Sequence, residues 1–231
     1  MALFTNEYIE GIRDKLSRPK NIDEGMFKTA LDEAIAAYSD TRPDETAEDT
    51  TGDGSFEYPL PAGWVEEFSG IISLAYPFVS TDQTYSYLKP GKDYTVDRTP
   101  SGLMLRFLAY IPTTAETFRI VYTIPHVVTG NSTTIPVVDE KAVLNCASGA
   151  MADMMAASYE KNTRTTFPDT QFDLRGKVNE YHTQADRYYK MWRMAMGISE
   201  DGSPAAASLH TDTDWYLAGG GEPLTHRLNQ L

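Results

Sequence analysis

The chain has few of the residues that disulfide frameworks and metal sites require. It contains a single cysteine, Cys146, and four histidines. One thiol cannot form a disulfide within a chain, and the sequence has neither a His-x-x-x-His nor a His-Glu-x-x-His pattern, so it offers no recognisable frame for zinc. We therefore expect no disulfide scaffold and no resident metal. The histidines are His126, His182, His210 and His226.

Positive charge is also scarce. Twenty Lys and Arg residues stand against 33 Asp and Glu, which gives a net charge of −13. Coating a nucleic acid or an anionic membrane requires clustered Lys and Arg, so both roles are disfavoured. No apolar run approaches the roughly 20 residues of a membrane span. The start of the chain, residues 1–7, lacks the basic and apolar stretches of a signal peptide. A soluble, acidic, non-secreted protein is expected.

Helical periodicity occurs on both sides of the middle of the chain. Apolar residues spaced by three and four predict two helices within 5–39, the first ending at Pro19 and the second capped by Asp23. A long alanine- and methionine-rich helix is predicted from 139 to 159. Another is predicted from 173 to 196, capped by Asp173 and ended by Gly197. This last helix carries a heptad stripe, formed by Leu174, Val178, Tyr181, Ala185, Tyr188, Trp192 and Ala195.

Between these helical regions, residues 64–125 read as β structure. Apolar residues alternate along 72–76, 103–107 and 118–124, which is typical of half-buried strands. A further strand pair is expected from 85–88 and 94–96. Turn residues separate the strands, and no helical crossover intervenes. We therefore predict four or five short antiparallel strands, in a meander or a small sandwich.

Two segments show no sustained periodicity. Residues 40–57 carry seven acidic residues against one base, Arg42, and predict a solvated linker or loop. Residues 198–231 contain glycine- and proline-rich stretches around a short aromatic cluster. This segment is expected to be an arm that becomes ordered against a partner, with the cluster as its partner-binding site. The cluster consists of Trp215, Tyr216 and Leu217.

Together these patterns predict an α+β fold in which a helical bundle is interrupted by a small antiparallel β insertion and followed by an extended C-terminal arm. Two domains joined at the acidic linker are the alternative. The insertion is preferred because the N-terminal helix pair is too small to bury its own apolar stripes. The expected segments are N-terminal helices at 1–39, acidic loop at 40–63, β insertion at 64–130, C-terminal helices at 131–197 and arm at 198–231.

No constellation of residues in the sequence predicts catalysis. Cys146 lies among alanines and methionines, where a thiol is not activated, and His126 and His182 are expected to be packing or surface residues. A calcium loop starting at Asp49 fails because its twelfth position holds Leu60, although a weaker cation site in the acidic loop stays open. Ser148 lies outside any Gly-x-Ser-x-Gly elbow, and no phosphate-binding loop occurs. We expect no enzyme activity, no catalytic residue and no cofactor.

The order of elements resembles a known protein family. The resemblance rests on 70–77, 94–97, 103–107 and 118–126, followed by 135–139, which opens the alanine-rich helix. These segments resemble the adaptor proteins that join the portal to the tail in tailed bacteriophages. That family has a helical bundle, often interrupted by a β insertion, and a C-terminal arm. The resemblance covers about residues 5–196 and leaves the acidic segment and the tail outside.

The resemblance implies a virion structural protein, made in the host cytoplasm and placed in the neck between capsid and tail. It implies a homo-oligomeric ring, a dodecamer, whose partners are the portal protein and a tail or tail-completion protein. Phage DNA would pass through the ring without sequence-specific binding, and no membrane is involved. The acidic balance agrees, because a basic lumen would bind phosphate.

Two alternatives stay open. The first is a tail-completion or capsid-associated protein of the same particle. The second is a β-domain ligand-binding module that uses exposed aromatics such as Tyr85, Tyr87 and Tyr110.

Overall fold

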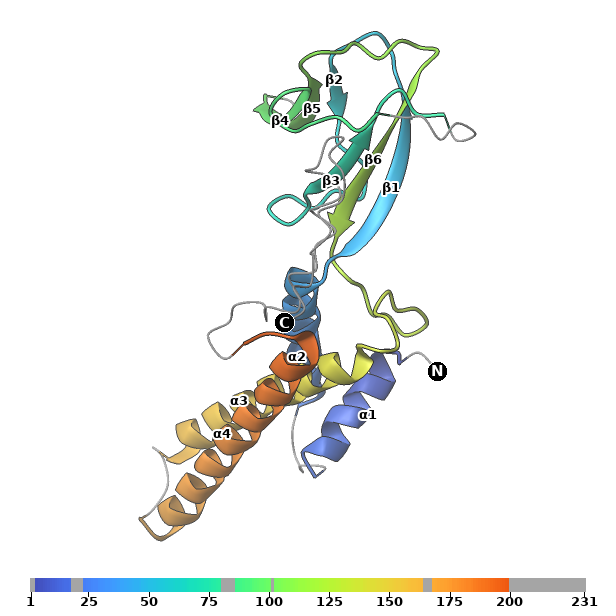
Figure 1. The fold of residues 1–231 in the computed structure, drawn as a ribbon. Helices are drawn as coiled ribbons and strands as arrows, with labels where there is room; N and C mark the ends of the chain where they lie inside the picture. Colours follow the sequence, from blue (N-terminus) through green and yellow to red (C-terminus); the bar gives the residue numbers. More distant parts are fainter. Residues whose placement is uncertain (1–2, 18–22, 80–85, 101, 164–167, 200–231) are drawn as a thin grey trace, which may run out of the picture.

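The computed structural model describes residues 3–17, 23–79, 86–100, 102–163 and 168–199. Within these ranges four helices and six strands form an α+β fold, as predicted. Figure 1 shows the strands gathered in a β domain at one end of a helical bundle. The chain leaves the bundle after its second helix and returns to it before its third. The β domain is therefore an insertion in the bundle, which was the preferred alternative.

The helical bundle is built around its third helix. The helices are α1 (Thr5–Lys15), α2 (Glu24–Thr41), α3 (Glu140–Thr163) and α4 (Pro168–Met196), and α3 packs most extensively against α4 and then α2. Small residues let these helices approach closely. At Gly149 an added Cβ would lie only 3.0 Å from the ring of Tyr189 on α4. None of the described helices is both long enough and apolar enough to cross a membrane.

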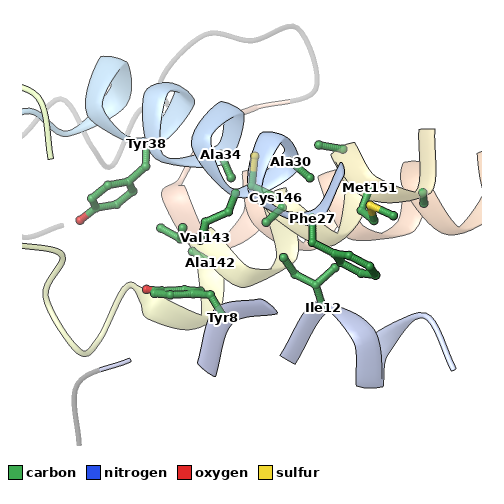
Figure 2. Packing of buried hydrophobic residues seen from close by; sticks show 14 of the residues in the cluster. Tyr8, Ile12, Phe27, Ala30, Ala34, Tyr38, Ala142, Val143, Cys146 and Met151 are labelled. Carbon is green, nitrogen blue, oxygen red and sulfur yellow. The ribbon is translucent and has the colours of Figure 1, made fainter. Parts of the chain in front are cut away.

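The core of the bundle confirms the two predicted N-terminal helices. Residues from α1, α2 and α3 meet in Figure 2, where Tyr8, Ile12, Phe27 and Tyr38 lie against the alanines, Val143 and Met151. A helix whose apolar residues point in several directions must be covered on several sides, which explains the central position of α3. Asp23 caps α2 as predicted, its Oδ1 accepting from the backbone N of Gly25 at 3.2 Å.

The start of α4 corrects one prediction. Because α4 begins at Pro168, Asp173 lies inside the helix, and the prediction that Asp173 caps it is wrong. Proline suits the first turn of a helix, where its missing N–H is not needed. The predicted end is confirmed, since Gly197 follows the helix with φ 69°.

The predicted heptad stripe of α4 holds in its middle and fails at its end. Tyr181, Ala185, Tyr188 and Trp192 pack on the bundle core, but Ala195 is exposed and Met196 is buried in its place. An α-helix has 3.6 residues per turn, so a strict seven-residue pattern drifts by about 20° per repeat on a straight helix. That drift moves the buried position forward by one residue.

The β domain contains two three-stranded antiparallel sheets. One has the order β1 (Asp44–Thr51), β6 (Thr117–Ile124), β3 (Ile71–Ala75), and the other β2 (Glu57–Pro59), β5 (Gly102–Phe107), β4 (Tyr94–Thr99). Both contribute to one aromatic-rich core, so the domain is the predicted sandwich and not the meander. The buried members of that core are Tyr58, Leu74, Tyr76, Leu88, Tyr94, Leu105, Phe107, Phe118, Ile120 and Tyr122.

Strand β1 overturns the prediction of a solvated loop over 40–57. Its eight residues pair with β6 from Asp44 opposite Ile124 to Thr51 opposite Thr117. Backbone pairing requires no apolar side chain, and Thr favours strands. Arg119 on β6 adds two hydrogen bonds to the Asp49 carboxylate, at 2.5 and 2.7 Å. Charges along an edge strand also oppose pairing with further strands.

The predicted strand at 94–96 is confirmed as part of β4, but its predicted pairing with 85–88 is wrong. β4 pairs with β5, from Tyr94 opposite Phe107 to Thr99 opposite Gly102. Residues 86–88 instead lie beside β3, where Tyr76 N donates to Ser86 O at 3.0 Å and Leu88 N to Leu74 O at 2.8 Å. Short alternating segments do not specify their partners, because several strands offer equivalent backbone groups.

The two cores contain separate sets of residues, which gives a first prediction. Phe118 is fully buried in the β-domain core. Phe118→Ala should lower the free energy of unfolding by about 3–5 kcal/mol because it leaves a cavity. Hydrogen exchange should accelerate in β6 and much less in α3. Ile72→Ala, which truncates an exposed side chain of β3, should change stability by less than about 0.5 kcal/mol. Equal acceleration in both regions would show that the cores unfold together.

Candidate functional site

Buried polar residues concentrate where the β domain joins the helical bundle. Tyr38 and Ser39 come from the last turns of α2, and His126 and Asp139 from the connection between β6 and α3. With Arg42, which follows α2, they form what we call the junction. A polar group is costly to bury unless it is hydrogen-bonded, so each of these contacts helps to hold the two parts of the molecule together.

Asp139 is the centre of the junction. Tyr38 Oη donates to its Oδ2 at 2.7 Å, and Arg42 Nη1 lies 3.0 Å from Oδ1 and 2.9 Å from Oδ2. Asp139 is 9% exposed while the Arg42 side chain is half-exposed, so the carboxylate gives up more hydration and depends on these donors. Burial, reinforced by the hydrogen bond to Asp139, raises the pKa of Tyr38 well above its usual value.

His126 ties the same two segments together by a second route. Its backbone N donates to Ser39 Oγ at 2.9 Å, and its Nε2 lies 3.0 Å from the backbone O of Arg42. A carbonyl only accepts, so Nε2 carries the proton in this contact. Nδ1 lies 2.8 Å from Thr134 Oγ1, and the ring lies 4.8 Å from the ring of Tyr38. The expectation that His126 is a packing residue is confirmed.

The other candidates from the sequence lie on separate elements with separate partners. Cys146 is 5% exposed on α3, and desolvation by burial raises the pKa of its thiol to about 12. Ser148 Oγ donates to Leu144 O at 2.7 Å within the same helix. His182 is an exposed residue of α4, with Nδ1 3.4 Å from Asp153 Oδ1. Both the buried thiol and the surface histidine agree with their predictions.

Carboxylates of the acidic segment, residues 40–57, accept hydrogen bonds from nearby residues of the β domain. Hydrogen bonds from Arg119 lower the pKa of Asp49, and those from Ser55 lower the pKa of Asp53. Asp53 Oδ1 accepts from Ser55 N at 2.8 Å, where Gly54 takes φ 85° in the turn. Across the part of the chain that the structure describes, no group of three or more His, Cys, Asp or Glu side chains could hold a metal ion.

Some of the large apolar side chains that are exposed gather in three places, and such residues often mark interaction sites when they gather. The end of the β domain farthest from the helices carries Phe56, Leu108, Tyr110 and Ile111, which we call the distal surface. The backbone bonds Phe107 N to Phe56 O and Gly54 N to Pro112 O hold its two loops together. The other two places are the β6–α3 connection, with Val127, Val137 and Val138, and the last turns of α4, with Met191 and Met194.

The predicted partner-binding residues Trp215, Tyr216 and Leu217 lie outside the described residues. Of the aromatics considered for ligand binding, Tyr87 and Tyr110 are exposed, and Tyr85 lies outside the described residues. The junction was not predicted from the sequence. Its one signal is Arg42, the single base within 40–57, and the neighbouring sequence does not identify Asp139 as its partner.

The chain matches no protein-family model and no curated protein.

The junction gives a second prediction. Asp139→Asn removes the charge that Arg42 and Tyr38 share, and should lower the free energy of unfolding by about 2 kcal/mol, less than for a fully buried pair because Arg42 is half-exposed. Urea denaturation measures the loss, and hydrogen exchange should accelerate in residues 38–42 and 124–139. Asp32→Asn, at an exposed position about two turns earlier in α2, is the matched control and should leave both unchanged. An equal effect of the two substitutions would contradict the central role of Asp139.

A third prediction concerns Cys146. A raised pKa means that thiolate forms only as pH rises towards about 12, so the native protein at pH 8 should react with a thiol reagent far more slowly than an unfolded cysteine, whose pKa is about 8.5. Reactivity should appear in denaturant. Rapid modification of the native protein at pH 8 would show that α3 opens locally or that the thiol is accessible.

Proposed function

We propose that this chain is a virion structural protein, a head-to-tail adaptor that forms a ring between the portal and the tail of a tailed bacteriophage. The observation that carries the proposal is the insertion of a small antiparallel β domain between α2 and α3 of a helical bundle. This is the arrangement that the resemblance of the sequence to the adaptor family implies.

The distribution of exposed apolar residues supports an assembly role. The distal surface lies at one end of the molecule, and the valines of the β6–α3 connection and the methionines of α4 lie near the bundle (Figure 1). An adaptor has to contact different partners at different places, whereas an isolated monomer gains nothing from such side chains. In this proposal the portal, the tail proteins and neighbouring copies cover these surfaces.

The charge supports a passage for DNA. A net charge of −13 repels the phosphate backbone, so a ring of such chains would let DNA move through without holding it. The proposed role involves no turnover and no cofactor. The protein would act by position and would remain in the neck of the particle.

Two other functions have support. A tail-completion or capsid-associated protein of the same particle would share these features, and its copy number and position in the virion distinguish it from a ring below the portal. Exposed Tyr87 and Tyr110 favour a β-domain ligand-binding module, and binding of a glycan or peptide by the purified protein, lost in Tyr110→Ala, would support that alternative.

The fourth prediction tests the adaptor role with particles assembled without this protein. Such DNA-filled heads should fail to join tails, and purified protein should restore joining. The restored fraction should rise with added protein until each head has received a full ring, because a structural part is consumed once per particle. Restoration by a few molecules per hundred heads would indicate turnover and would overturn the proposal.

The arm can be tested in the same assay. Deleting residues 200–231 should leave the melting temperature nearly unchanged and abolish stable attachment, and replacing Trp215, Tyr216 and Leu217 by alanine should reproduce most of the loss. Replacing Thr211, Thr213 and Asn229 by alanine is the matched control. If attachment persists without the arm, or the deletion unfolds the protein, the predicted docking role is wrong.

A further inference from the structure

The outward face of α4 carries cations and methionines together. Arg187, Lys190, Met191 and Met194 are all exposed, Met194 at 72%, and their spacing of three, four and seven puts them on one side of the helix. At about 100° per residue, their mean direction around the helix axis is roughly opposite to that of Ala185, Trp192 and Met196, which face the bundle core. We call these four residues the α4 stripe.

The macrodipole of α4 does not account for the stripe. It favours cations only within the last turn of a helix, where α4 has Arg193, and Arg187 and Lys190 lie before that turn. Exposed methionines gain nothing from the macrodipole, and Met is an adaptable residue at protein contacts. The methionines therefore point to a covered surface.

A second surface has the complementary character. It consists of Val127, Val137 and Val138 on the β6–α3 connection, with Asp40 and Glu45 beside them, and we call it the receiving surface. Val138 is 85% exposed, and both acids are exposed. The backbone N of Thr134 donates to Val127 O, and the backbone N of Val127 donates to the side-chain Oγ1 of Thr134, which draws the connection into a compact loop.

The contacts of the junction place the acids next to the valines. Ser39 Oγ accepts from His126 N, so Asp40 and Val127 directly follow two bonded residues. Glu45 pairs with Thr123 on β6, just before the connection begins. Arg42 is the cation within this turn, and Asp139 offsets its charge. Lys141 is exposed at the start of α3, so the surface remains acidic by one charge.

The two surfaces are formed by different elements. In Figure 1 the β6–α3 connection is on the right of the bundle, and α4 runs from its lower left to its centre. A contact between two different surfaces leaves one of each open on every pair of copies. Repetition of that contact builds a closed ring if the rotation closes, and a filament otherwise.

We propose that the α4 stripe of one copy binds the receiving surface of the next copy. Met191 and Met194 pack on the valines, and Arg187 and Lys190 face Asp40 and Glu45. This inference rests on the proposed ring and names the surfaces that form it. Charge complementarity decides the occupant: in a chain of net charge −13, the last turns of α4 match an acidic apolar surface that every other copy supplies.

The test measures self-association of the full chain by sedimentation equilibrium at several salt concentrations. Wild-type protein should associate, less strongly at high salt because the charges are screened. Arg187→Glu with Lys190→Glu, and separately Asp40→Lys with Glu45→Lys, should each weaken association about tenfold or more. Combining all four changes in one chain should restore it, because both surfaces are then reversed. Met194→Asp should weaken association at every salt concentration.

The control variant carries Lys28→Glu with Lys92→Glu, two exposed positions that change the net charge by the same amount as the α4 variant. It should associate like the wild type. Circular dichroism identifies any variant that has lost its fold, and Met194→Ser then replaces Met194→Asp as the milder substitution.

Three outcomes would overturn the inference. The first is a wild type that stays monomeric at all concentrations. The second is association that is indifferent to both charge reversals. The third is loss in the α4 variant without loss in the acidic variant and without restoration in the combined one, which would assign the stripe to residues 200–231 or to another protein. The joining assay reads the adaptor function separately, because a chain can form these contacts without joining heads to tails, or join them through other contacts.

Discussion

The arrangement of the molecule depends on the contacts of one buried carboxylate, that of Asp139. A domain inserted into a bundle is attached by two segments of chain, and each can bend at its junction with the helices. Arg42 belongs to the outgoing segment and Asp139 to the returning one, so their ion pair closes the attachment. His126 then adds a backbone and a side-chain contact to the same two segments. Arg42 reaches both carboxylate oxygens through its single nitrogen Nη1, so the contact brings the two segments together at one point.

The two hydrophobic cores that the junction connects contain different types of residue. The bundle core relies on alanines around α3, with methionines and a few aromatics filling the gaps. The β-domain core relies on rings packed edge to face, such as Phe107 against Phe118 at 5.1 Å. Small residues allow helices to lie close together, whereas large rings fill the space between two short sheets with few residues. Each part can therefore retain its packing while the junction determines how the parts are oriented.

The residue types of each element explain how much of the fold could be predicted from the sequence. In the helices and in β6, the apolar residues recur at the period of the element itself, so these elements could be predicted from the sequence. Asp23 could be predicted as a cap in the same way. β1 could not, because its apolar partner residues all belong to β6. The junction was also hidden, since Arg42 and Asp139 are separated by 97 residues. Tyr87 and Tyr110 were named only in the alternative of a ligand-binding module. The α4 stripe was not predicted, because methionine in a helix is as typical of a core as of a surface.

The acidic edge strand has a consequence for the accuracy of folding. β1 presents mainly threonines and carboxylates on both of its faces, so a slip of two residues along β6 would keep every side chain on the same side of the sheet. Little apolar burial would be lost in the slipped state. The pairing of Asp49 with Arg119 penalises that error, because a slip of two would put Ala47 or Thr51 opposite the guanidinium. A surface ion pair of small energetic weight thus selects one alignment among near-equivalent ones, and specificity here comes from a charge where most sheets obtain it from an apolar pattern.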